Sequence, residues 1–175
     1  AEGLILMLKK KEINTIKYPN GDVYEGEVKY EVVNGERKAI REGKGKMKFA
    51  NGDEYDGDWK NDKQNGYGTL ETKNGESVVL YSGGFVNGKK EGEGRTMSDV
   101  EGTAYEFGKE AGVLGKRDFE GFWKQDLKEG EGILYSDLIV SHEDFKQEIE
   151  IRFEGNFSRD RKNGFGRLDY QTIIQ

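Results

Sequence analysis

The chain has no cysteine, one histidine (His142) and one proline (Pro19) among its 175 residues. Without cysteine it forms no disulfide and has no thiolate nucleophile, which suits a reducing compartment such as the cytosol. A His/Cys zinc site needs several such ligands, so it is excluded within this chain. A Ser-His-Asp triad would depend on His142, which lies in an insertion. We therefore predict no catalytic residue, no metal site and no bound cofactor, and expect that this chain is not an enzyme.

Long hydrophobic runs are also missing. The longest run is Leu4-Ile5-Leu6-Met7-Leu8, far short of the ~20 residues that a membrane-spanning helix needs. Basic residues follow it and no small-residue cleavage site is evident, so we do not expect this run to be a signal peptide. Hydrophobic residues make up only 33% of the chain and charged residues 35%. Such a chain favours a sheet with one aromatic layer over a thick globular core.

Glycine is abundant, with 26 copies, and its spacing to aromatic residues is regular. Tyr55-x-Gly57-x-Trp59 is followed by Gly66-x-Gly68, and the same two elements recur along the chain. A unit of about 23 residues accounts for this recurrence and predicts a repeat array. The units begin at Tyr24, Tyr55, Tyr81, Phe119 and Phe153, and a degenerate unit begins at Ala1.

Each unit has the alternation of a half-buried strand. The first, third and fifth positions share one face because strand side chains alternate with period two, and the even positions are mostly polar. Asn20-Gly21, Asn51-Gly52 and Asn74-Gly75 supply turns, since Asn and Gly tolerate positive φ. The pattern predicts hairpins that stack into one long antiparallel sheet with an aromatic ladder.

Residues 1–175 form a single array with three longer insertions, near 29–40, 98–118 and 136–148. We expect the first to lengthen a hairpin, and Ser141-His142-Glu143-Asp144 in the last to start a helix. Long loops in repeat proteins are often functional, so we expect the insertions to select the partner. The chain starts and ends in frame with its units and lacks an initiator Met, so we expect a segment of a longer protein.

The unit Tyr55-Asp56-Gly57-Asp58-Trp59-Lys60-Asn61 and the segment Tyr24-Glu25-Gly26-Glu27 resemble the MORN repeat, and the resemblance covers essentially the whole chain. It implies an all-β, elongated, single-layer antiparallel sheet of stacked hairpins, similar to a solenoid. The chain looks like cytoskeletal and ciliary MORN arrays, such as radial-spoke components. That likeness implies a non-catalytic scaffold or docking module among other proteins of a multi-subunit assembly, in the cytoplasm and, more narrowly, in the axoneme.

The aromatic face is the first candidate surface for a partner. A single-layer sheet has no second layer to cover it, so we expect some rings to stay exposed; the alternative is that they only pack against each other. The candidate residues are Tyr24, Tyr55, Trp59, Tyr81, Phe85, Phe119, Trp123, Phe153 and Phe157.

A basic edge along the hairpin turns is the second candidate. It would bind anionic membranes at about 1 kcal/mol per basic residue, and this makes a membrane-junction or phosphoinositide-binding module the main alternative function. A net charge of −6 and neighbouring acidic residues oppose it, argue against nucleic acid, and favour a merely solvated edge. The residues are Lys60, Lys63, Lys89, Lys90, Lys124, Lys128, Arg161 and Lys162.

Two further hypotheses stay open. In the first, the array is an accessory to an enzyme whose catalytic domain lies outside this chain. In the second, the ends of the array are covered by more repeats, by end-to-end packing or by a homodimer mate. The Leu4–Leu8 run and the segment Tyr170-Gln171-Thr172-Ile173-Ile174 both have the character of strands that need a neighbour.

Overall fold

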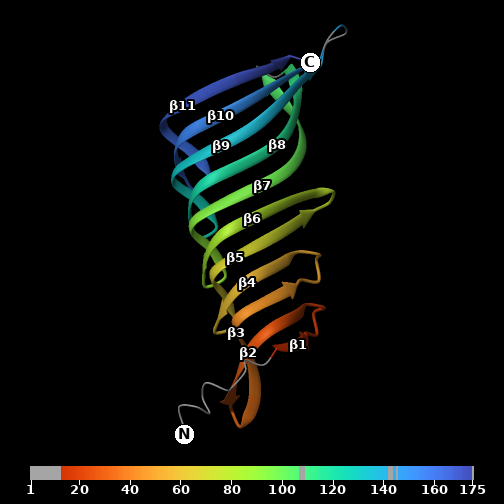
Figure 1. Cartoon of the computed structure of the whole chain (residues 1–175), viewed down its shortest axis with the longest axis vertical. Coiled ribbons are helices and arrows are strands. Elements are labelled where there is room, and N and C mark those ends of the chain that lie inside the picture. The colour runs from red at the N-terminus through yellow and green to blue at the C-terminus, as the bar shows by residue number, and fades with distance from the viewer. Residues whose placement is uncertain (1–12, 107–108, 142–143, 145, 175) are drawn as a thin grey trace.

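One antiparallel sheet makes up the part of the chain that the structure describes. The computed structural model describes residues 13–106, 109–141, 144 and 146–174. Eleven strands pair in chain order, each with its sequence neighbours, so that the sheet is long and narrow with β1 at one end and β11 at the other (Figure 1). The strands are β1 (Ile13–Lys17), β2 (Val23–Val33), β3 (Glu36–Lys48), β4 (Glu54–Lys60), β5 (Lys63–Asn74), β6 (Ser77–Val86), β7 (Lys89–Glu106), β8 (Lys109–Lys124), β9 (Leu127–Ser141), β10 (Lys146–Ser158) and β11 (Arg161–Ile174). The predicted all-β fold of stacked hairpins is confirmed.

Tight two-residue turns close the hairpins on one side of the sheet. Both turn residues have positive φ, as in Asn61 (48°) and Asp62 (70°). This geometry matches the twist of the flanking strands and is tolerated by Asn, Asp and Gly. The equivalent turns are Asn34-Gly35, Asn61-Asp62, Asn87-Gly88, Gln125-Asp126 and Arg159-Asp160.

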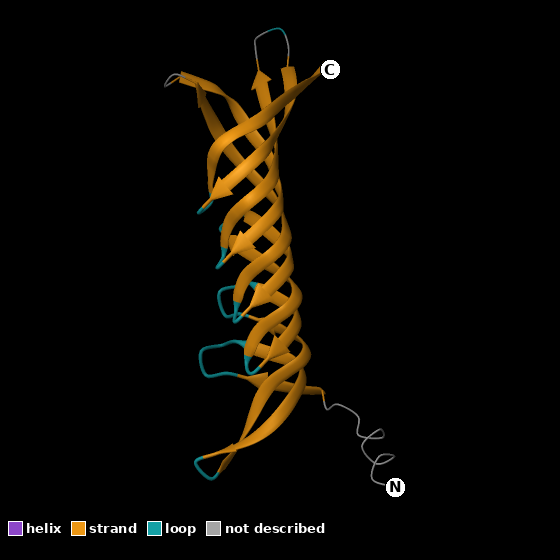
Figure 2. Cartoon of the chain, turned by 90° about the vertical axis from the view of Figure 1, so that its left-hand side faces the viewer, coloured by secondary structure: helices purple, strands orange, loops and turns teal. Residues whose placement is uncertain are grey.

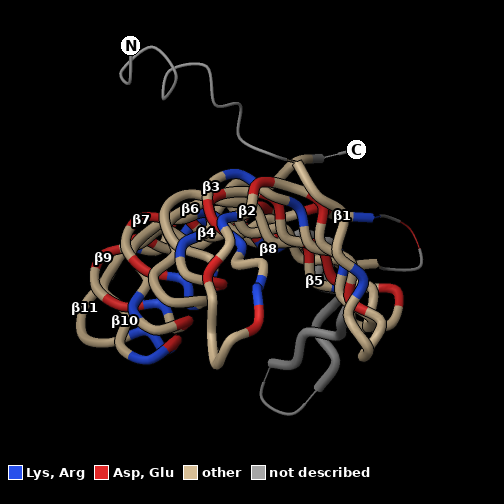
Figure 3. The backbone as a smooth tube through the Cα atoms, turned by 90° about the horizontal axis from the view of Figure 1, so that it is seen from below, with Lys and Arg blue, Asp and Glu red and all other residues tan. Residues whose placement is uncertain are grey.

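A register shift recurs after the first glycine of each unit. In β4 it lies between Gly57 and Trp59, and in β8 between Gly121 and Trp123. Such bulges bend a strand and increase its right-handed twist. The strands accordingly cross the long axis obliquely and the sheet coils strongly (Figure 2). Seen along that axis, Lys/Arg and Asp/Glu positions are intermingled over the sheet (Figure 3).

The insertions extend strands rather than form separate loops. Residues 29–40 lengthen the β2–β3 hairpin, and the extensions of β7 to β10 take up most of 98–118 and 136–148. The helix expected to start at Ser141 is wrong for the described residues, because Gln147 pairs with Val140 and Glu148 with Ile139 across the β9–β10 hairpin. Ladder hydrogen bonds over many residues outweigh one local capping signal. His142 and Glu143 lie outside the described residues.

The two outer strands differ in length. β1 has five residues and β11 has fourteen, and each pairs on one side only within the described chain. Tyr170 lies in β11, as expected of a strand that needs a neighbour. The Leu4–Leu8 run and the start of the degenerate unit lie outside the described residues.

Candidate functional site

The first, third and fifth positions of the units lie on one face of the sheet, which we call the ladder face. Their rings meet edge to face, with neighbouring centroids 5.0–5.8 Å apart and planes at 81–88°. Each such contact contributes about 0.5–1.5 kcal/mol beyond burial. The rings follow one another in the order Tyr24, Trp59, Tyr55, Phe85, Tyr81, Trp123, Phe119, Phe157 and Phe153.

The rings of this ladder are enclosed. Eight of them are at most 6% exposed, and Phe153 at the end is partly buried. The expectation that several rings stay exposed is therefore wrong, and the alternative that they pack against each other is confirmed. A role of these rings in binding a partner stays a prediction.

Glycine pairs explain how a single sheet buries its own rings. Gly26 and Gly45 pair across β2 and β3, and a Cβ on Gly45 would lie 2.3 Å from Tyr24 Cε2. The ring therefore lies flat on the glycine backbone, and its hydroxyl donates to the carbonyl oxygen of Glu27 (2.6 Å). Burial raises the pKa of Tyr24 to about 12. Burial also raises the pKa of Tyr55 and of Tyr81, which occupy the same position in the next two units.

Cationic side chains cover the outer side of the ladder. The distances to ring centroids are 4.7 Å from Arg41 Cζ to Trp59, 5.1 Å from Lys90 Nζ to Trp123, 5.1 Å from Lys128 Nζ to Phe119 and 4.4 Å from Lys162 Nζ to Phe153. Cations over ring faces are attracted by the ring quadrupole. Burial lowers the pKa of the Lys128 ammonium, Asp160 opposes this shift, and Arg117 and Lys90 add to it.

The predicted basic edge thus divides into two groups. Lys90, Lys128 and Lys162 lie over rings of the ladder. The other members project from the turns as exposed side chains: Lys60, Lys63, Lys89, Lys124 and Arg161.

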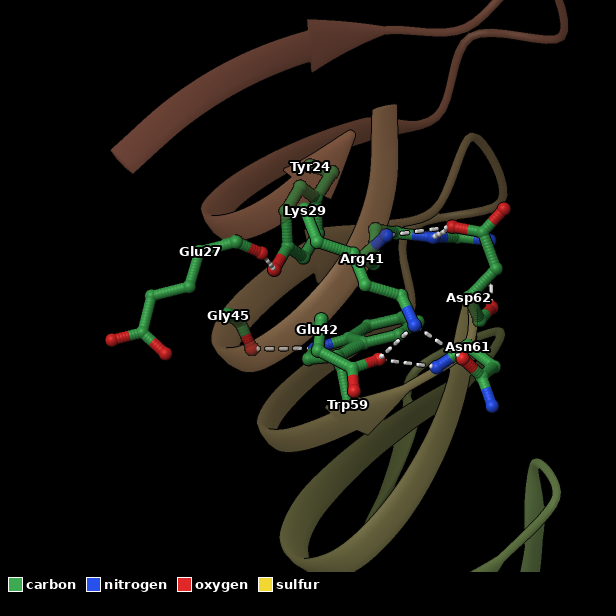
Figure 4. A network of polar contacts seen from close by, with 9 residues as sticks. All are labelled: Tyr24, Glu27, Lys29, Arg41, Glu42, Gly45, Trp59, Asn61 and Asp62. Atoms are coloured by element: carbon green, nitrogen blue, oxygen red, sulfur yellow. Dashed lines mark hydrogen bonds and ion pairs between the residues drawn. The ribbon is translucent and has the colours of Figure 1, made fainter. Parts of the chain in front are cut away.

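Four of these turns, all except Asn34-Gly35, are also hydrogen-bonded to the preceding unit. In Figure 4, Arg41 donates its backbone N–H (2.9 Å) and its Nε–H (2.8 Å) to Asp62 Oδ1. The backbone N–H of Asn61 donates to Glu42 Oε2 (2.7 Å). Burial by itself raises the pKa of Asp62, but the donors from Arg41 outweigh it, so that the pKa is lowered. These bonds fix the position of one unit on the next.

The same arrangement recurs along the chain. Lys90 N–H donates to Asp126 Oδ1 (2.8 Å), and Asp126 N–H donates back to the Lys90 carbonyl oxygen (3.0 Å). Lys128 and Asp160 repeat this pair of bonds. Together with the ladder, these bonds join the described units into one continuous body.

The opposite face of the sheet carries a groove. It consists of a hollow of about 600 Å³ over β5 to β10 and a second of about 490 Å³ over β7 to β11, and both are lined by Arg95 and Glu120. Glycine backbone at Gly94, Gly121 and Gly132 forms part of its floor. No ring of the ladder is among the residues that line it.

Exposed aromatic rings lie in this groove. Tyr67 is 62% exposed, Phe122 44% and Tyr135 37%. Large exposed rings in a hollow are typical of interaction sites. The sequence signal for Phe122 was its even position in the unit that begins at Phe119, where the even positions are mostly polar.

Carboxylates dominate the charged lining of the groove. In the first hollow they are Glu93, Glu120, Glu131 and Glu154. The second hollow shares Glu120 and adds Asp118, Asp137, Glu150 and Asp169. The alternation of the units places Glu120 and Glu154 at even, polar positions, but it does not indicate that acidic residues from five strands share one groove.

Metal ions in proteins are bound by clusters of His, Cys, Asp or Glu side chains. The described residues hold no cluster of His, Asp and Glu that could bind a metal ion. In the same part of the chain, no helix is long and apolar enough to cross a membrane. His142 lies outside the described residues, and the absence of enzyme activity stays a prediction.

Comparison with known proteins gives the family. The model of the MORN repeat matches five segments, at residues 37–54, 55–77, 81–97, 119–137 and 153–172. The last four matches begin at unit starts of the sequence analysis. No curated protein gives a significant match to the chain. MORN repeats are protein-binding or membrane-binding modules, and more than half of this chain consists of them: it belongs to the MORN repeat family.

Proposed function

We propose that this chain is a non-catalytic docking module that holds a segment of a partner protein in its groove, as part of a larger cytoskeletal assembly. The observation that carries the proposal is the division of aromatic residues between two faces. The ladder rings are buried against one another, whereas Tyr67, Phe122 and Tyr135 are exposed in the groove. Rings that do not contribute to the core are the ones available to a partner.

The size of the groove limits what it binds. Hollows of about 600 and 490 Å³ accommodate several side chains of an extended or helical segment, and not a folded domain. The bonded turns and the ring ladder keep the floor rigid, so the array loses little conformational entropy when it binds. A rigid floor with exposed rings is suited to docking.

Site-specific photo-crosslinking tests this function. A photoreactive residue in place of Phe122 is expected to crosslink to one defined partner segment, identified by mass spectrometry of the linked peptide. Tyr30 is the matched control, because it is 39% exposed, similar to Phe122 at 44%, but lies outside the groove. Equal crosslinking at both positions, or none at Phe122 within the native assembly, would contradict the proposal.

The cytoskeletal and, more narrowly, ciliary or axonemal setting rests on the resemblance to other MORN arrays. It predicts that the native protein stays with the insoluble residue during mild detergent extraction and is released by high salt. Release by detergent from a fraction that floats with membranes would contradict it. Homodimers or end-to-end packing through β11 are a separate proposal, which sedimentation of the purified chain tests.

A membrane-binding module is the second candidate, favoured by the exposed cations at the turns. Lys63, Lys89 and Lys124 are exposed, and none of them lies over a ring of the ladder among the described contacts. Replacing all three by Glu is expected to abolish liposome binding if this candidate is correct. Lys90 and Lys128 are unsuitable for that test because they lie over ladder rings. An enzyme domain outside the chain is a third candidate, which the full-length reading frame decides.

A further inference from the structure

We infer that the groove selects a cationic partner: a peptide segment in which lysine or arginine residues alternate with apolar side chains. This inference rests on the proposed docking function and specifies the chemistry of its partner. It follows from the charge balance of the groove, from the carboxylates that have no cation beside them, and from the rings between them.

The groove holds the entire excess of negative charge of the protein. Among the described residues, eight acidic and two basic side chains line its two hollows. The whole chain has 34 acidic and 28 basic residues. The remainder therefore contains 26 of each sign and is balanced. A hollow with one sign of charge concentrates ligands of the opposite sign and raises their association rate.

Only part of this charge is neutralised within the groove. Arg95 Nη1 lies 3.6 Å from Glu120 Oε1, and Arg152 Nη1 lies 3.0 Å from Glu154 Oε2. Within the described chain, four other lining carboxylates have no cation within ion-pair distance. They are Glu93, Glu131, Asp137 and Glu150.

The four carboxylates come from three strands. Glu93 lies on β7, Glu131 and Asp137 on β9, and Glu150 on β10. They are therefore distributed over both hollows, in a form that suits several cations of one segment better than a single ion. Consistent with this, the described residues hold no cluster that would bind a metal ion.

The aromatic rings determine the apolar part of the partner. Phe122 and Ile133 line the same hollow as Glu93 and Glu131, and Tyr67 lies at its β5 side. An arginine or lysine side chain suits both features, because its stem packs on apolar surface while its charged end reaches a carboxylate or a ring face. Acidic peptides, nucleic acids and anionic lipid headgroups would be repelled.

Calorimetric titration with synthetic peptides tests this inference. The probes are helix-forming peptides of equal length in which leucine is combined with arginine, with glutamine or with glutamate. The arginine peptide is expected to bind, with an affinity that falls as salt is added, and to bind at least roughly tenfold more tightly than the glutamine peptide. Equal binding of the arginine and glutamate peptides would overturn the inference.

Two charge variants of the full chain locate the site. Glu131→Lys with Asp137→Lys reverses two unpaired groove carboxylates, and Glu36→Lys with Glu76→Lys reverses two exposed carboxylates away from it. Both change the formal net charge from −6 to −2. The groove variant is expected to lose the arginine peptide and the control to keep it. Equal losses would mean that only the overall charge attracts the peptide, and would overturn the inference.

The inference and the docking function fail in different ways. If the native partner is lost on Phe122→Ser but retained by the Glu131→Lys, Asp137→Lys variant, docking in the groove stands and a cationic partner is excluded. If neither variant affects capture of the native partner, the docking function itself is wrong. Circular dichroism of each variant confirms that the array remains folded.

Discussion

The ring of Tyr55 lies flat against Gly68 of the neighbouring strand. A Cβ on Gly68 would lie 2.4 Å from Tyr55 Oη, far inside contact distance, while the Tyr55 hydroxyl donates to the carbonyl oxygen of Asp58 at 2.8 Å. The hydrogen bond holds the ring in place, so it cannot swing away from an added methyl group. Burial of the ladder in a single-layer sheet therefore depends on the absence of a side chain at this position.

Gly68→Ala is expected to destabilise the array by about 1–3 kcal/mol, the usual cost of overpacking a well-packed site. Gly68 does not have a positive φ, so the cost is steric and not a matter of backbone conformation. Urea unfolding monitored by tryptophan fluorescence measures it, because Trp59 packs against Tyr55.

A double-mutant cycle identifies the cause of that loss. In a Tyr55→Ala background, Gly68→Ala is expected to cost much less than in the native chain, because the ring that the methyl group meets is gone. Thr69→Ala at the adjacent position is the control for a general effect on β5. Equal costs of Gly68→Ala in both backgrounds would show that the ring contact is not responsible.

The turn at Asp126 provides a second prediction. Asp126 has φ 71° and accepts the Lys90 N–H, whereas Gly88 at the same position of another turn keeps the geometry without a side chain. Asp126→Gly is therefore expected to cost about 0.5–1.5 kcal/mol, the worth of one hydrogen bond. Asp126→Ala loses the same bond and adds about 1–2 kcal/mol of left-handed strain, so it is expected to be the worse variant.

Asp126→Asn is the matched control, since it retains both an acceptor oxygen and tolerance of positive φ. Its unfolding midpoint should stay close to that of the native chain. If Asn proves as damaging as Gly, the negative charge of Asp126 matters more than the hydrogen bond.

The fold was predictable because every unit repeats one local code. Alternation of aromatic and polar residues indicated the strands, and Asn-Gly pairs indicated turns. The fixed spacing implied that equivalent hairpins stack on one another along a single sheet. The failure at Ser141 has the opposite character. The prediction of a helix rested on a capping signal of four residues. It took no account of the long β9–β10 hairpin, in which Val140 pairs with Gln147. Tertiary pairing of this kind leaves little trace in a local pattern.

The site was less predictable than the fold. The rings of Trp59 and Trp123 were correctly placed on one face. Their enclosure also depends on Arg41 and Lys90, which lie over these rings, and the spacing of residues in the sequence does not predict those contacts. The groove was missed for a related reason. Glu93 and Glu131 lie far apart in the sequence and come to line one hollow through the pairing of β7 with β8 and of β8 with β9.

The division into two faces predicts opposite results for two phenylalanines. Phe85 is 3% exposed and packs edge to face on both Tyr55 and Tyr81, so Phe85→Ser is expected to cost about 3–5 kcal/mol. Phe122 is 44% exposed, and Phe122→Ser is expected to change stability by less than about 1 kcal/mol while weakening partner binding. Thermal unfolding and partner binding, measured on the same samples, check both. A large loss of stability at Phe122 would mean that its ring belongs to the core.

Alkaline pH is expected to unfold the array through its buried tyrosines. An unfolded tyrosine ionises near pH 10, whereas burial raises the pKa of Tyr24 to about 12 and raises those of Tyr55 and Tyr81 in the same direction. The folded state therefore binds these protons more tightly than the unfolded state. Its full stability is present below about pH 10 and is lost progressively as the pH rises toward 12.

Conservative substitutions separate this effect from general charge repulsion at high pH. The triple variant Tyr24→Phe, Tyr55→Phe and Tyr81→Phe loses the hydroxyls that donate to backbone carbonyl oxygens, so it should be less stable at about pH 8. Its urea midpoint should then fall less between about pH 8 and about pH 11 than that of the native chain, because its ladder has no group left to ionise. Replacing the exposed Tyr30, Tyr67 and Tyr170 by Phe removes the same number of hydroxyls and should leave the native pH dependence intact. If both triple variants lose stability with pH as steeply as the native chain, ionisation of the ladder tyrosines is not what limits the array in alkali.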